Sequence, residues 1–90
     1  MSLNEIRRQI DVIDTALVQA LAAREELVRR AAAFKVDEQA VRAPDRVDEV
    51  IAKVQALADE MGASPEVVDR VYRTMIDAFI DLELAAHRED

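Results

Sequence analysis

The chain opens with a helical repeat that runs unbroken through the first third of its 90 residues, and this repeat limits the possible folds most strongly. Side chains of one helix face return at alternating spacings of four and three residues. These positions are Ile6, Ile10, Ile13, Leu17, Ala20, Arg24, Leu27, Ala31 and Phe34. Ser2 and Glu5 have the spacing of a capping box, so we expect the helix to begin there. No helix breaker follows before the stretch from Val36 to Ala43.

Two further amphipathic helices are predicted in the remainder of the chain. Pro44 suits the first turn of a helix and Gly62 suits its end, so we expect the second helix between them. Ser64 and Pro65 provide the cap and the first-turn proline of the third. The two apolar stripes are Val47, Val50, Val54, Leu57 and Met61, then Val68, Val71, Met75, Ala78, Leu82 and Ala85. The pattern predicts an all-α fold with three helices and a frayed end from His87 to Asp90.

The first helix is too long for a core built by one copy of the chain. At about 33 residues it spans about 50 Å, whereas a compact chain of this length is about 30 Å across. Its repeat is apolar throughout, so the overhanging part needs another chain to cover it. We expect residues 1–90 to form a single domain that assembles as a homodimer or larger helical assembly. A detached coiled coil is the alternative, and the two further amphipathic helices favour a globular bundle.

Composition excludes several classes of function. One Gly rules out Gly-rich phosphate loops, and the absence of Cys rules out disulfides and thiolate metal sites. A single histidine, His87, argues against zinc sites and histidine-based triads. A net charge of −7 and three aromatic residues argue against nucleic-acid binding. No apolar run reaches membrane-spanning length and no signal peptide is evident, so we expect a cytoplasmic protein that uses no metal or other cofactor.

The most informative position is Arg24, a charged residue where the apolar repeat calls for Ile or Leu. Burying an unpaired guanidinium is costly, so an anion should lie beside it: a carboxylate of the protein, or a ligand carboxylate or phosphate. Lys35 follows about three turns later on nearly the same face, and Arg46 lies in the first turn of the second helix. Arg7 is about 25 Å from Arg24 along the helix, but an antiparallel dimer can bring it near the partner's Arg24.

A second stripe on the third helix carries an acid. It consists of Tyr72, Ile76, Phe79, Glu83 and Ala86, again in steps of three and four. Glu83 therefore lies on an apolar face, where desolvation raises the pKa of a carboxyl group and favours a neutral proton donor. The alternative is a buried ion-pair partner for Arg24 or Arg46.

Five segments together point to a known family. They are Ile6-Arg7 with Ile13-Asp14, Leu21 to Arg24, Phe34-Lys35, Val41 to Arg46, and Met75 to Glu83. In this order and spacing, from Leu3 to about His87, the chain resembles the all-helical chorismate mutases and their relatives, the isochorismate pyruvate lyases. The resemblance implies an intertwined homodimer with two identical sites, each completed by an arginine of the partner chain.

The resemblance also assigns roles to the charged residues. Arg24 and the partner's Arg7 are expected to bind the two carboxylates of chorismate. Lys35 is expected to donate to the ether oxygen and to a nearby carboxylate. No cofactor, no metal and no nucleophile is implied.

The remaining contacts come from the loop and the later helices. Arg46, with Val41 and Arg42 before it, is expected to close and charge the site. Glu83 falls where many members have Gln and some have Glu, and is expected to donate to the same ether oxygen. Phe79, one turn earlier, is counted among the substrate contacts.

Two residues bear on which reaction is catalysed. Many mutases have Asp at the position of Ala43, and Ala43-Pro44 followed by an acid and Arg46 is more similar to the lyases. The lyases, however, carry Gln at the position of Glu83, where Glu is known among mutases. We favour a chorismate mutase over an isochorismate pyruvate lyase. A non-catalytic helical dimer serving as an interaction module is the third reading, and Arg24 and Glu83 argue against it.

Overall fold

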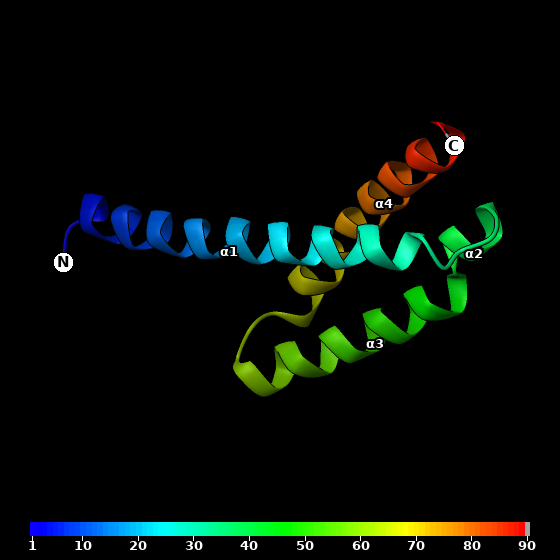
Figure 1. Ribbon diagram of the computed structural model, residues 1–90. Helices are drawn as coiled ribbons and strands as arrows, with labels where there is room; N and C mark the ends of the chain where they lie inside the picture. The colour runs from blue at the N-terminus through cyan, green and yellow to red at the C-terminus, as the bar shows by residue number, and fades with distance from the viewer. Residues whose placement is uncertain (90) are drawn as a thin grey trace.

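The computed structural model describes the backbone of residues 1–89 and the side chains of residues 1–87. These residues form α1 (Leu3–Ala32), α2 (Glu38–Arg42), α3 (Pro44–Met61) and α4 (Pro65–Glu89), with no β-strand among them (Figure 1). The all-α fold with three long helices is therefore confirmed. The prediction that the chain frays from His87 is wrong as far as Glu89, because α4 continues to that residue. Asp90 lies outside the described residues.

Helix α1 begins as predicted and ends earlier. The Ser2 hydroxyl oxygen accepts a hydrogen bond from the Glu5 N–H at 3.2 Å, and the Ser2 N–H donates to the Glu5 carboxylate at 3.3 Å. At the other end, the N–H groups of Phe34 and Lys35 bond to carbonyls three residues back, which tightens the last turn and ends the helix. The expected continuation to Lys35 is thus wrong, and Phe34 is 88% exposed instead of packing in the repeat.

A short helix, α2, occupies the stretch that was expected to connect the first two helices. Asp37 caps it, because its side-chain oxygen accepts a hydrogen bond from the Ala40 N–H at 2.8 Å. Ala43 ends it in the left-handed region at φ 37°, and Pro44 then begins α3 as predicted. An aspartate before a run of good helix formers is a recognisable start signal, so this helix was open to prediction.

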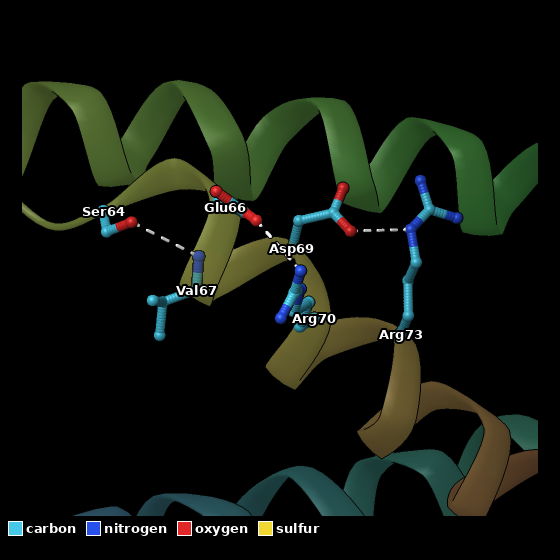
Figure 2. A network of polar contacts seen from close by, with 6 residues as sticks. All are labelled: Ser64, Glu66, Val67, Asp69, Arg70 and Arg73. Atoms are coloured by element: carbon cyan, nitrogen blue, oxygen red, sulfur yellow. Dashed lines mark hydrogen bonds and ion pairs between the residues drawn. The ribbon is translucent and has the colours of Figure 1, made fainter.

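The core lies between α3 and α4, with α2 packed on α4. Its buried apolar side chains are Val41, Ile51, Val54, Ala58, Ile76 and Leu84. Gly62, at φ 76°, ends α3 in the left-handed conformation that glycine adopts without strain. Ser64 then accepts a hydrogen bond from the Val67 N–H at 3.4 Å at the start of α4 (Figure 2).

A polar contact holds the first turns of α4 against α3. Asp69 accepts a hydrogen bond from Nε of Arg73 at 2.8 Å, as Figure 2 shows, and another from Gln55 of α3 at 2.6 Å. The Arg73 hydrogen bond holds the pKa of the Asp69 carboxyl below its ordinary value, with the Gln55 hydrogen bond acting in the same direction.

The N-terminal half of α1 extends beyond the other helices (Figure 1). The molecule measures 52 × 26 × 16 Å and its radius of gyration is 15.9 Å, against about 12 Å for a compact chain of this length. The expected overhang is confirmed. None of the residues of α1 is buried within one chain, and the apolar side chains from Leu3 to Leu17 on its repeat are 42% to 59% exposed. Within the described residues, no helix combines the length and apolar character needed to cross a membrane.

Candidate active site

A cavity of about 310 Å³ lies where the C-terminal part of α1, the short helix α2, the start of α3 and the middle of α4 meet. One part of its wall is apolar and is formed by Val47, Val50, Ile76 and Ile80. The polar part carries four cationic side chains and one carboxylate, which are Arg24, Lys35, Arg42, Arg46 and Glu83. A cavity of this size with convergent polar groups is typical of a small-molecule site.

Arg24 projects into this cavity without a carboxylate of the protein beside it. Its guanidinium carbon lies over the ring of Phe79, 5.2 Å from the ring centroid. Among the side chains that the structure describes, no acid forms an ion pair with Arg24. Of the two anions expected for this arginine, the protein carboxylate is therefore not found among the described residues of one chain.

Lys35 and Glu83 form the central ion pair of the cavity. The Lys35 ammonium lies 2.9 Å and 3.2 Å from the two oxygens of Glu83, whose side chain is 6% exposed. The expected burial of Glu83 is confirmed. Of the two readings left open for it, the structure shows an ion pair, and its partner is Lys35 instead of Arg24 or Arg46. Lys35 lies just after α1, and its side chain reaches across to α4.

Arg42 and Arg46 line the rim of the cavity. Arg42 pairs with Glu38 at 2.9 Å, and Arg46 pairs with Glu49. All four side chains are more than half exposed, so these pairs are in contact with water and contribute little to stability. Both arginines can therefore turn toward an anion in the cavity at small cost.

Seven of the eight residues predicted for the site line the cavity; besides the five charged groups, these are Val41 and Phe79. Arg7 does not, because it lies on the overhanging half of α1, about 25 Å from Arg24 along the helix. The apolar wall was not predicted as part of the site. Val50, for example, was predicted as a core residue, because the apolar repeat does not distinguish a core position from a cavity wall.

The charges of the cavity favour a small anion with more than one negative group. Four of the lining side chains are cationic and one is a carboxylate, although the whole chain carries a net charge of −7. Arg42 and Arg46 also pair with Glu38 and Glu49 at the rim. Guanidinium and ammonium groups bind carboxylates with charge-assisted hydrogen bonds. Among the described residues, no group of three His, Cys, Asp or Glu side chains is placed to hold a metal ion.

Comparison with known proteins agrees with this geometry. Residues 6–84 match the family described as chorismate mutase type II, a range that contains Arg7, Glu83 and every residue of the cavity between them. The isochorismate pyruvate lyase of Pseudomonas aeruginosa is 33% identical over 87 residues, which cover 97% of this chain and 86% of the lyase. The resemblance seen in the sequence is confirmed, and the chain belongs to the chorismate mutase type II family.

Proposed function

We propose that the protein is a chorismate mutase, which rearranges chorismate to prephenate. The proposal rests on one observation. Arg24, which forms no ion pair with a described acid, lines the same cavity of about 310 Å³ as the Lys35–Glu83 ion pair. Arg24 provides a grip for a substrate carboxylate, and Lys35 provides a donor for an oxygen in the middle of the ligand.

The reaction suits such a cavity. In a single pericyclic step one C–O bond breaks while one C–C bond forms, so neither an enzyme nucleophile nor an external proton is consumed. The enzyme has to hold a compact conformer of the substrate. It also has to stabilise the negative charge that grows on the ether oxygen. A cation about 4 Å from that oxygen contributes about 4 kcal/mol at an effective dielectric constant near 20.

Glu83 can take part in two ways. As a carboxylate, it accepts both hydrogen bonds from Lys35 and holds the ammonium in the cavity. The family resemblance implies a second role, in which Glu83 donates a hydrogen bond to the ether oxygen. Glu83→Gln separates the two roles, because Gln keeps donors for the ether oxygen and carries no charge to pair with Lys35.

We also propose that the enzyme is an intertwined homodimer. A groove of about 950 Å³ runs between α1 and α4, lined on the α1 side by Val18, Leu21 and Ala22. It offers a second copy of α1 an apolar surface, and such a copy could bring its Arg7 toward Arg24. This arrangement would complete the site with a further cation for the second carboxylate.

Isochorismate pyruvate lyase activity is the second candidate. It is favoured by Ala43, which provides no side-chain carboxylate at the cavity wall, and by the similarity to the Pseudomonas aeruginosa lyase. In that reaction the ether C–O bond breaks, and the hydrogen on the hydroxyl-bearing ring carbon moves to the enolpyruvyl methylene. Salicylate and pyruvate result. The same two carboxylates have to be held, so both reactions use the same cations.

The test is an assay of the purified protein with chorismate and isochorismate side by side, for wild type and Glu83→Gln. We expect chorismate to be converted to prephenate. If Glu83 donates to the ether oxygen, the Gln variant keeps most of the activity, and if Glu83 acts only by holding Lys35, the Gln variant loses most of it. Salicylate formation without prephenate would replace the mutase with the lyase, and turnover of neither substrate would favour the non-catalytic dimer.

A further inference from the structure

Arg24 differs from most other arginines of the described helices in having no acidic partner on its own helix. Six of them, from Arg29 to Arg73, pair with an acid three or four residues away on their own helix. The positions three and four residues from Arg24 hold only Ala20, Leu21, Leu27 and Val28. Its helix therefore offers it no counter-charge at these positions, and its guanidinium lies over an aromatic ring.

That ring belongs to Phe79, which occupies a special place in α4. It is one turn before Glu83 and lines both the cavity and the apolar groove between α1 and α4. The ring therefore forms part of the partition between the two, with Arg24 on the cavity side. A cation over an aromatic face is attracted by the ring quadrupole.

We propose that Phe79 is the positioning residue for Arg24: its ring holds the guanidinium in the cavity in place of an acid. A carboxylate would occupy the N–H donors and would compete with the anionic ligand. The ring attracts the charge through its face and accepts no conventional hydrogen bond, so the N–H donors stay available for a substrate carboxylate. The inference rests on the proposed function, since it assigns to Phe79 a part in binding the anionic substrate of the same site.

The effect should appear in substrate binding and not in the chemical step. Arg24 binds a carboxylate that does not react, so its interaction is similar in the ground state and in the transition state. A partly buried cation–π contact corresponds to about fivefold to tenfold in an equilibrium constant. Loss of the aromatic face should therefore raise KM by about that factor and leave kcat within about threefold.

The variants that test this are Phe79→Leu and Phe79→Met, which keep an apolar side chain without a ring, and Phe79→Tyr, which keeps the ring. Tyr72→Leu is the matched control, because it removes a partly buried aromatic residue from the same stripe of α4, away from the cavity. We expect KM for chorismate to rise in the Leu and Met variants, to rise less in Phe79→Tyr and to stay unchanged in Tyr72→Leu. An equal rise in Phe79→Tyr or in Tyr72→Leu, or none in Leu and Met, would overturn the proposal.

A second measurement tests the contact between Arg24 and Phe79 directly and does not depend on enzymatic activity. The Nε–H proton of Arg24, observed by NMR in the ligand-free protein, should be shifted upfield by the ring in wild type and in Phe79→Tyr. It should return toward its ordinary position in Phe79→Leu and Phe79→Met, and stay shifted in Tyr72→Leu. An unshifted proton in wild type would overturn the role of Phe79, whereas a shifted proton in a protein that turns over neither substrate would contradict only the proposed function.

Discussion

The two halves of α1 have the same apolar repeat but very different surroundings. From Leu3 to Leu17 the repeat extends past the rest of the molecule, and its side chains are about half exposed. From Arg24 onward the helix lies over α4 and contributes a wall of the cavity. A helical repeat therefore reveals which face is to be covered, but not whether the cover comes from the same chain.

The difference extends to the charged residues. Arg24, in the second half, reaches the cavity within its own chain, whereas Arg7, in the first half, does not line that cavity. If both arginines act on one substrate, the first half must reach a second copy of the chain. Substitutions in the two halves can therefore test whether the first half acts on the partner's site and the second half on the site of its own chain.

The largest effect is expected from removing either arginine. Arg24→Ala and Arg7→Ala should each lower kcat/KM for chorismate at least about 100-fold, mainly through KM, because each removes a charge-assisted hydrogen bond to a substrate carboxylate. An equimolar mixture of the two inactive variants should recover roughly a quarter of the wild-type activity, because half of the dimers are mixed and each has one complete site. Steady-state rates before and after mixing measure the recovery.

Arg8→Ala is the control, since Arg8 is an exposed neighbour of Arg7 on the overhanging half. It should keep wild-type activity. Mixed dimers that form and stay inactive would assign each site to one chain and would remove the distinction between the two halves.

A smaller effect is expected from a charge on the overhanging repeat. Ile13, 59% exposed in one chain, should be covered in the dimer, and burying an Ile side chain stabilises by about 1.5 kcal/mol or more. Ile13→Asp introduces two such losses per dimer, so the dimer dissociation constant should rise about 100-fold. Sedimentation over a range of protein concentrations measures it.

Val12→Asp provides the matched comparison, because Val12 is 71% exposed on the same half but lies off the repeat. It should leave the dissociation constant within a few-fold of wild type. Equal effects of the two substitutions would mean that the repeat on this half is not the covered face.

Much of the fold follows from local signals in the sequence. The cap at Ser2, the proline at Pro44 and the glycine at Gly62 act through the backbone of their own turn, so the starts and ends that they predict are found in the structure. The end of α1 and the short helix α2 were missed for different reasons. The first depends on a tightened last turn with no Gly or Pro to mark it, and the second on a single capping residue, Asp37.

The site was predicted less completely, because its contacts join residues far apart in the chain. The repeat shows that Arg24 and Glu83 lie on apolar faces, and both line the cavity. It does not show which partner each one meets. Lys35, just after α1, pairs with Glu83 of α4, and Arg24 of α1 lies over Phe79 of α4, and both contacts join segments far apart in the chain.

The smallest effect is expected for the stability of the hairpin of α3 and α4, whose contacts lie within one chain. Asp69 bonds to Arg73 and Gln55, and the Arg73 hydrogen bond lowers the pKa of its carboxyl below 3.8. A carboxylate whose pKa is depressed in the folded state stabilises the protein fully above its unfolded-state pKa, and this contribution is lost as the pH falls through the folded-state value.

Asp69→Asn should therefore lower the unfolding temperature slightly at neutral pH, and the difference from wild type should shrink in acid. Thermal unfolding followed by circular dichroism at several pH values and two protein concentrations measures both trends. Because the contact lies within one chain, its loss should not depend on protein concentration, in contrast to the loss in Ile13→Asp. Asp81→Asn, which changes an exposed acid on the same helix, should have no comparable effect. A concentration-dependent loss in Asp69→Asn would mean that the hairpin, like the overhanging half of α1, depends on the second chain.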